Sequence, residues 1–525
     1  MKDTLKRDAS AYQGKTPTVP ETSAPFFIAA KKFDGLEAEY NGKLIDQFNK
    51  HLKINTEFNA FRLNREECEV SPDKIVIIDA SNDSLPLSHE SMRIFKTSLD
   101  KKGVQIPIVV VNERDELLKA LDGNAHDTLV FSQCVDKRAY DLSLCNVIEE
   151  NGAVVVPGKL TAPGSVFSDK ARTYDLLSKN SSEWDLVAHF YAVHVGDDSV
   201  EEVVERIMAA VDDMECQLGI KKFFIKPAEG GGGLGGFRIL KHGDDYLLPD
   251  MSKVSEKSSV AHPSFIDFDA DNPHVIRELL WIYDLFKTEE STRDTYLKLN
   301  IEQMQKEMGL SSREETMKAY LGVSGEKQHE AMGKEAKTRA ETAQTIVNAV
   351  CDFENKFQKR YHPIVNRQIE FGTWGLRAHY RLSTEGIILE TIYSRIFQIE
   401  FSPDGIGYVG ADNISNKQTG ALEIVRLVPI NKLMVNAIGG EAQLFRALSS
   451  GAKAMVQLLE SLPEEERCRV PVRVQIDLAA PSALLCEGNA DTARGLSLAS
   501  NWERLIRNSN EWLEDALSYY SWKKS

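Results

Sequence analysis

The 525-residue sequence contains no long apolar run and no paired-cysteine motif. Its apolar stretches, such as Pro107–Val111, fall far short of the roughly 20 residues that a membrane-spanning helix needs. The polar start of the chain, over 1–24, lacks the apolar core of a signal peptide. Seven scattered cysteines without CxxC spacing argue against a disulfide framework or a structural zinc site. These absences predict a cytoplasmic protein that does not bind a membrane.

Positive charge is also scarce. The chain has 63 Lys and Arg against 79 Asp and Glu, a net charge of −16. Nucleic-acid binding depends on basic surfaces, so no nucleic-acid partner is expected. A local basic pocket for a small anionic ligand remains compatible with this charge.

The apolar pattern predicts an α/β protein with several domains. Short β-branched runs, including Lys74–Asp79 and Ala153–Val156, alternate with helical patterns up to about residue 157, as in a parallel sheet. Two strands flank a glycine cluster near residue 230. Residues from about 271 to 360 have a helical pattern, and strand patterns then return before a C-terminal amphipathic helix.

The glycine cluster Gly230–Gly236 places six glycines in seven positions. No Lys-Ser/Thr pair follows, which excludes a Walker A loop, and a strand follows instead of the helix of a dinucleotide-binding loop. We expect a β-hairpin loop whose free N–H groups cover a polyphosphate, with the ammonium of Lys226 on the same phosphates. A flexible linker is the alternative, disfavoured because the cluster lies inside a strand pair.

Four further segments suggest a site, although each alone has an ordinary structural explanation. Lys170 follows Ser-Asp at a helix start, and Ile364–Ile369 is a short strand whose backbone could bracket a flat ring. Arg377 and Arg395 lie on later strands and suit phosphate or carboxylate oxygens, or surface ion pairs. Asp477, Glu487 and Asn489 end two strands. Three oxygen ligands of this kind, completed by phosphates, are typical of Mg²⁺ sites, whereas singly they would be turn residues.

In this order, the motifs SDK, FFIKPAEGGGGLGG, VNRQI, QID and ExN resemble the ATP-grasp superfamily, which includes D-alanine–D-alanine ligase and glutathione synthetase. The resemblance covers about residues 150–495. It implies the following layout: a flexible tail (1–24), a preATP-grasp-like parallel α/β domain (25–157), a lid subdomain with the glycine loop (158–250), a helical insert (251–360), an ATP-grasp C-terminal subdomain with hinge and metal site (361–495) and a C-terminal helix (496–525).

The resemblance also implies roles for single residues. ATP would be held by Lys170, Lys226, Glu229, Gly230, Gly231, Gly232, Gly233, Leu234 and Gly235, and its adenine by Val365, Asn366, Arg367, Gln368 and Ile369. Asp477, Glu487 and Asn489 would bind Mg²⁺. Arg377 would lie near the transferred phosphoryl group, with Arg395 a weaker match, and Arg494 would meet a substrate carboxylate.

The function that the resemblance implies is an ATP- and Mg²⁺-dependent carboxylate–amine ligase acting on small molecules. A small-molecule kinase on the same scaffold is the alternative, disfavoured because the N-terminal layer shows no dense Lys/Arg cluster. A non-catalytic nucleotide-binding protein is the third, disfavoured by the complete set of lysines and oxygen ligands. The helical insert is either a solvated helical face or an element for lid, substrate-recognition or oligomer contacts, which leaves a homo-oligomer open.

Overall fold

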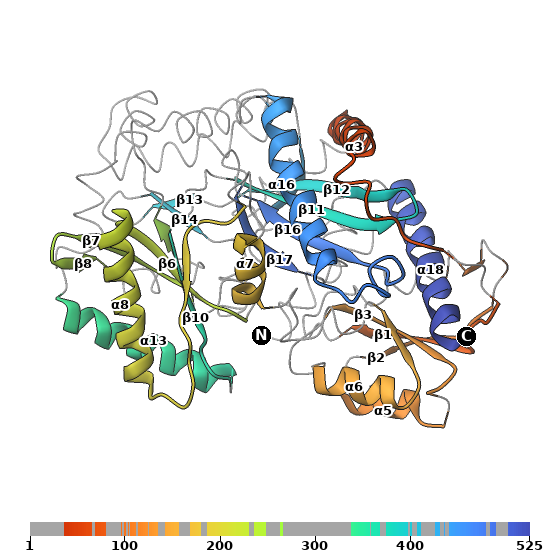
Figure 1. Cartoon of the computed structure of the whole chain (residues 1–525), viewed down its shortest axis with the longest axis horizontal. Helices are drawn as coiled ribbons and strands as arrows, with labels where there is room; N and C mark the ends of the chain where they lie inside the picture. Colours follow the sequence, from red (N-terminus) through yellow and green to blue (C-terminus); the bar gives the residue numbers. More distant parts are fainter. Residues whose placement is uncertain are drawn as a thin grey trace, which may run out of the picture.

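The structure is a computed structural model whose described residues form four sheets with their covering helices, and a large core is shared by two of these sheets (Figure 1). It describes residues 36–65, 69–79, 96, 99–100, 103, 105–111, 114–123, 125–134, 142–156, 169–179, 186–229, 236–247, 263–265, 338–357, 359–367, 374–396, 399–401, 407–410, 426–430, 435, 440–478, 484–489 and 502–525.

The first sheet, here the N-terminal sheet, is parallel and has the strand order β2-β1-β3-β4. One of its faces packs on α5 and α6 through residues such as Val76 and Val130, and the other face, with Ile77 and Phe131, joins the shared core. Burial on both faces explains why these strands are continuously apolar. Its elements are β1 (Lys74–Asp79), β2 (Ile108–Val111), α5 (Arg114–Leu121), β3 (Thr128–Cys134), α6 (Leu142–Glu150) and β4 (Val154–Val156).

The second sheet, here the middle sheet, pairs all its strands antiparallel in the order β5-β10-β6-β7-β8. Helices α8 and α13 pack on it and on each other, and together they enclose a separate core. A capping box of Ser199 and Glu202 starts α8, and Gly219 in the left-handed conformation ends it. The elements are β5 (Phe190–Ala192), α8 (Val200–Leu218), β6 (Lys222–Pro227), β7 (Phe237–His242), β8 (Asp245–Leu247), α13 (Arg339–Phe357) and β10 (Pro363–Arg367).

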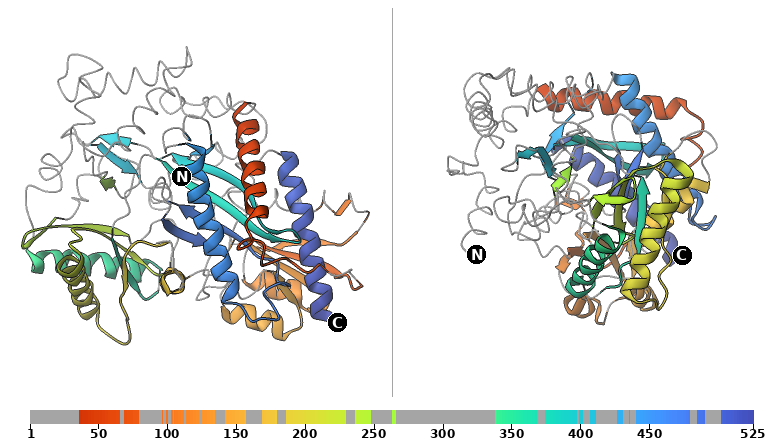
Figure 2. Two further views of the ribbon diagram at one scale, coloured as in Figure 1. Left: turned by 45° about the horizontal axis from the view of Figure 1, so that its top comes forward. Right: turned by 90° about the vertical axis from the view of Figure 1, so that its left-hand side faces the viewer.

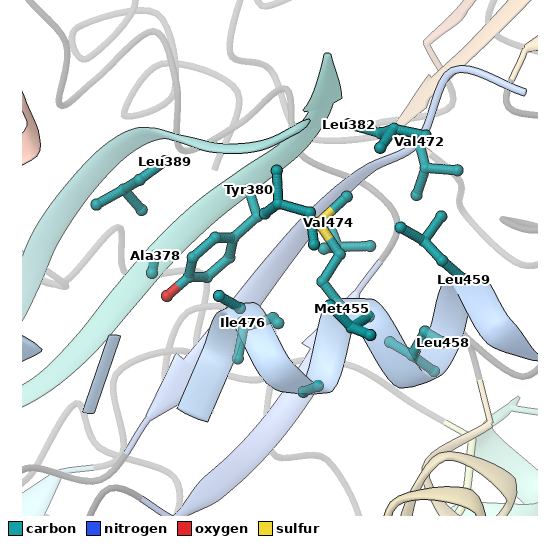
Figure 3. Packing of buried hydrophobic residues seen from close by; sticks show 14 of the residues in the cluster. Ala378, Tyr380, Leu382, Leu389, Met455, Leu458, Leu459, Val472, Val474 and Ile476 are labelled. Carbon is teal, nitrogen blue, oxygen red and sulfur yellow. The ribbon is translucent and has the colours of Figure 1, made fainter. Parts of the chain in front are cut away.

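The third sheet, here the C-terminal sheet, is antiparallel with the order β15-β12-β11-β16-β17. Because side chains alternate along a strand, it has two unlike faces. Tyr380, Val474 and Ile476 belong to the apolar face, which packs on α16 (Figure 3). The elements are β11 (Trp374–Ser383), β12 (Gly386–Ile396), β15 (Arg426–Pro429), α16 (Glu441–Glu460), β16 (Arg473–Leu478) and β17 (Leu485–Asn489).

The opposite face of the C-terminal sheet is polar, and a buried ion network occupies one end of it. The guanidinium of Arg381, which is fully buried, donates to Glu390 Oε1 at 2.9 Å and to Asp515 Oδ2 at 2.6 Å. Arg473 also pairs with Glu390, with Nε 2.6 Å from Oε2. Asp515 lies on α18 (Trp502–Lys524), so this network fastens the C-terminal helix to the sheet.

Helix α3 (Leu36–Ile54), within the segment 25–157, also lies against the C-terminal sheet. Two of its asparagines bond the backbone of β12, Asn41 Nδ2 to Ile392 O at 3.1 Å and Asn49 Nδ2 to Leu389 O at 2.9 Å. Figure 2 shows this helix in red beside the teal strands. The remaining elements are α7 (Lys170–Lys179) and a three-stranded sheet of β13 (Ile399–Phe401), β14 (Gly407–Gly410) and β9 (Pro263–Phe265).

The predicted mixed α/β class with a parallel N-terminal sheet is confirmed. Strand β12 runs unbroken from Gly386 to Ile396, because no glycine or proline interrupts it at Tyr393 and Ser394. Of the predicted helical insert (251–360), the described residues are 263–265, which form the strand β9, and 338–357 and 359–360. No helix in the described ranges combines the length and apolarity needed to cross a bilayer.

Candidate functional site

The two strands that flank the glycine cluster form an antiparallel pair, as the sequence predicts. Strands β6 and β7 pair antiparallel from Lys222–Leu240 to Ile225–Phe237. Residues 230–235, which include Gly230, Gly231, Gly232, Gly233, Leu234 and Gly235, lie outside the described residues. Glu229, the last described residue before them, forms an ion pair with Lys359. The base of the loop is therefore fixed to the segment that leads into β10.

The two predicted phosphate lysines are both attached to helix α7. Asp169 caps this helix, since its Oδ1 accepts from the backbone N of Ala171 at 2.8 Å and of Arg172 at 3.2 Å. Lys170 is the first helical residue and is buried. Lys226 Nζ donates to Tyr174 Oη on the same helix at 2.6 Å and lies 4.9 Å from the centre of that ring. Lys170 and Tyr174 are one helical turn apart, so both ammonium groups belong to one region.

Ala228 joins three elements at this point. Its carbonyl accepts from the backbone N of Lys170 at 2.9 Å, and its N–H donates to His362 O at 2.7 Å. Burial lowers the pKa of Lys359; the Asp169 carboxylate opposes this shift and the Lys170 ammonium adds to it. The start of α7, the end of β6 and the start of β10 thus form one cationic corner beside the glycine loop.

The predicted hinge begins inside the middle sheet. Val365 and Asn366 are buried on β10, which pairs with β5 on one side and β6 on the other. Arg367 is exposed, and its N–H donates to His189 O at 2.8 Å. Because sheet pairing uses the backbone of β10, main-chain contacts to a flat ring fall to residues after Arg367. Gln368 and Ile369 are in that part, outside the described residues.

Asn366 carries an orphaned polar atom. Its side chain is 3% exposed, and no described residue is a hydrogen-bond partner of its Oδ1. A buried carbonyl oxygen without a partner costs free energy, so such atoms in native structures usually meet a water or a ligand. An amino or hydroxyl donor of a bound nucleotide would satisfy this oxygen.

The second half of the site lies on the polar face of the C-terminal sheet. Arg377 on β11 and Asp477 on β16 are direct register partners. The guanidinium donates two hydrogen bonds to the carboxylate, from Nε to Oδ1 and from Nη2 to Oδ2, each 2.5 Å long. Both side chains are largely buried, which strengthens a charge-assisted bidentate pair.

Next to this pair, Gln475 and His379 continue the polar face toward the ion network. With its amide oriented to satisfy both of its ends, Gln475 Oε1 lies 3.1 Å from Nε and Nη2 of Arg377 and 3.3 Å from Nη1. His379 Nε2 lies 3.1 Å from Tyr393 Oη. Burial, together with the neighbouring charges of Arg377 and Arg473, lowers the pKa of His379 well below its usual value, so the imidazole is neutral.

The other two predicted metal ligands sit on the next strand, β17. Glu487 is the register partner of Asp477, and Asn489 is the register partner of Gln475. Arg395 is on β12, opposite Gly375 and Leu427. Arg494 lies outside the described residues. Arg377, Asp477 and Glu487 therefore occupy one row across three neighbouring strands.

Helix α7 connects the two halves of the site. Its first residue bonds to the end of β6, while its other side packs against α16 and β17. Figure 1 shows it between the middle sheet and the C-terminal sheet. The lysine corner and the strand that carries Glu487 and Asn489 are therefore contacts of the same helix.

No family model and no curated protein matches the chain. Several solved structures do. A D-alanine–D-alanine ligase from Bacillus anthracis complexed with ATP is 9% identical, with a TM-score of 0.41 over 87% of this chain and 99% of that one. D-alanyl-alanine synthetase A from Vibrio cholerae is 8% identical, with a TM-score of 0.42 over 86% and 99%. D-cycloserine synthetase DcsG is 11% identical, with a TM-score of 0.40 over 85% and 100%.

The motif order of the sequence resembles that of ATP-grasp enzymes. D-alanine–D-alanine ligase is the enzyme that the motif order resembles, and such ligases are among these structures. Identities near 10% with TM-scores below 0.5 leave the function to be argued from the chain's own residues.

The donor set of the candidate site fits the ligands that the motif order implies. Two carboxylates and one amide in adjacent register positions are hard oxygen donors, as Mg²⁺ prefers, and leave room in the shell for phosphate oxygens. Among the described residues, no group of three or more His, Cys, Asp or Glu could hold a metal ion without such help. Two lysines, together with an amide oxygen that has no partner among the described residues, likewise suit a nucleotide.

Sequence reasoning missed three side chains in this region. Tyr174 could have been found because it is four residues after Lys170 and so lies on the same face of a helix. Gln475 is two residues before Asp477 and shares its face of the strand. Lys359 carries no such signal, since it reaches the glycine loop only through the pairing of β10 with β6.

Proposed function

We propose that the chain is an ATP- and Mg²⁺-dependent ligase that joins a small carboxylic or amino acid to an amine. The observation that carries the proposal is the position of α7. One helix contacts both the lysine corner beside the glycine loop and the strand of Glu487 and Asn489. A nucleoside triphosphate with its metal would need cations at the lysine corner and oxygen ligands on the neighbouring strand.

The proposed reaction has two steps. A carboxylate oxygen of the acid attacks the γ-phosphorus of ATP, the bond to the β-phosphate oxygen breaks, and an acyl phosphate and ADP form. The amine nitrogen then attacks the acyl carbon, phosphate leaves with the electron pair of the C–O bond, and the nitrogen loses a proton. Neither step needs a nucleophilic side chain, so the protein contributes position and charge.

Each described side chain has a task in this scheme. Lys170 and Lys226 neutralise phosphate oxygens, and Tyr174 orients Lys226 through its hydroxyl. Arg377 stabilises the charge on the phosphoryl group in transfer. Asp477, Glu487 and Asn489 would hold Mg²⁺, which when bound would supply charge neutralisation for the phosphates. The glycine loop excludes water, which would otherwise hydrolyse the acyl phosphate.

The test is to incubate the purified chain with Mg-ATP and pools of acids and amines while ADP and free phosphate are measured together. Equal, pool-dependent release of both is expected, and dividing the pools then identifies the substrates. ADP without free phosphate would mean that the phosphoryl group stays on the product, and would replace the ligase with a kinase. Asp477→Asn is the control for turnover by a contaminating enzyme, because it should abolish both signals.

A further inference from the structure

The Arg377–Asp477 pair occupies the carboxylate that the proposed metal needs. Both Asp477 oxygens accept from the guanidinium at 2.5 Å. Each carboxylate oxygen has a second lone pair, so Mg²⁺ can bind Asp477 beside the guanidinium, but the two cations repel each other and each weakens the binding of the other to the carboxylate. The metal and the arginine therefore compete for the same two atoms.

Gln475 lies where it can receive the arginine when the metal takes Asp477. Its carbonyl oxygen is 3.1–3.3 Å from all three guanidinium nitrogens, so it lies over the face of the group, and a turn of the guanidinium would bring this oxygen into the plane of the N–H donors. The side chain is 6% exposed and stands on the rigid strand β16, two residues from Asp477. A neutral amide holds a guanidinium less tightly than a carboxylate does, so it can keep the group in place without blocking its move toward a phosphate.

We propose that in the empty enzyme Arg377 binds the Asp477 carboxylate and opposes metal binding there. Gln475 is the positioning residue that holds the Arg377 guanidinium once the metal is bound. This inference rests on the proposed function, because it takes Asp477 as a metal ligand. The exchange would release the guanidinium from Asp477 at the moment when a metal–nucleotide complex brings in the phosphoryl group that it is to stabilise. Binding of the metal would therefore free the guanidinium to contact the phosphoryl group.

The test measures binding of manganese(II) without nucleotide, by electron paramagnetic resonance of the free ion, in wild type, Arg377→Met, Gln475→Met and the double variant. Arg377→Met should bind manganese at least about tenfold more tightly, since a charge-assisted competitor is gone. Gln475→Met should bind it about threefold more weakly, because the displaced arginine has lost its acceptor. In the double variant the effect of Gln475→Met should vanish.

Arg206→Met is the matched control. Arg206 lies on α8 and pairs with Asp198 at 2.9 Å, so this variant removes the same charge away from Asp477 and should leave manganese binding unchanged. Circular dichroism and thermal unfolding establish that each variant is folded.

The outcomes separate this inference from the function on which it rests. Equal manganese affinity in wild type and Arg377→Met would show that Arg377 does not oppose metal binding, and would leave the metal site itself unaffected. Loss of affinity from Gln475→Met of the same size in both backgrounds overturns the role of Gln475. Absence of manganese binding in wild type and in Arg377→Met overturns the metal site and this inference together.

Discussion

Replacing Gly451 by alanine should destabilise the protein although the residue lies inside a helix. A Cβ at this position of α16 would stand 2.5 Å from Tyr380 Oη and 2.9 Å from two atoms of the ring. Tyr380 is fully buried in the core between β11 and α16 (Figure 3), and its hydroxyl donates to Leu448 O at 2.7 Å. The ring therefore has no free space into which to move.

Three free-energy contributions decide whether Gly451→Ala stabilises or destabilises the protein. Alanine gains about 1 kcal/mol of helix propensity over glycine. Overpacking a filled core costs about 1–3 kcal/mol, and a strained or lost hydrogen bond of Tyr380 costs about 1 kcal/mol. The net free energy of unfolding should fall by roughly 1–3 kcal/mol.

The assay is urea unfolding, with Gly42→Ala as the matched control. Gly42 also lies inside a helix, α3, but a Cβ there would have as its nearest neighbour Arg504 Nη2 at 3.6 Å, an ordinary contact. Gly42→Ala should therefore stabilise the protein by up to about 1 kcal/mol. If Gly451→Ala were as stable as Gly42→Ala, the packing argument around Tyr380 would be refuted.

Three further predictions concern charged and titratable groups. Lys226→Ala should abolish ATP turnover while the circular dichroism spectrum stays that of wild type, and retained turnover would contradict the phosphate site. Arg381→Met should cost about 3 kcal/mol in urea unfolding, because it removes the cation that the buried Glu390 and Asp515 share and leaves each with one arginine, Arg473 and Arg65 respectively; adding Asp515→Asn should recover part of that loss, and no recovery would speak against the ion network. His379 is held neutral in the folded state and takes up a proton in the unfolded chain below its ordinary pKa of 6.5. The stability of wild type relative to His379→Gln should therefore be greatest above pH 6.5 and shrink by about 1.4 kcal/mol per pH unit below it; a pH-independent difference in urea unfolding would exclude a buried neutral imidazole.

Much of the site's frame follows from local pattern. The two strands around the glycine cluster, the helix that Asp169 caps and the strand containing Asp477 are local structures, and period and capping chemistry suffice to predict them. The alignment of Asp477 with Glu487 is also accessible, because a short connection joins β16 to β17.

Other features depend on pairings that local pattern does not encode. The contact between Arg377 and Asp477 joins residues 100 positions apart and requires β11 to lie beside β16 in one particular register. A shift by one residue would turn Arg377 to the apolar face. The sequence also does not show that the backbone of β10 is used in pairing with strands on both sides. A five-residue strand has the same pattern at a sheet's edge and at its centre.

The docking of α3 on the C-terminal sheet has a consequence for the order of folding. Asn49 and Leu389 exchange hydrogen bonds across 340 residues of chain, and Asn41 reaches Ile392 across 351. During synthesis α3 is made long before the strand that completes its packing, and an isolated helix of this length has little stability in water. The apolar side of α3 therefore stays without its partner until β12 has been translated. We expect the nascent chain to depend on chaperones through this interval, and refolding to be limited by closure of this contact.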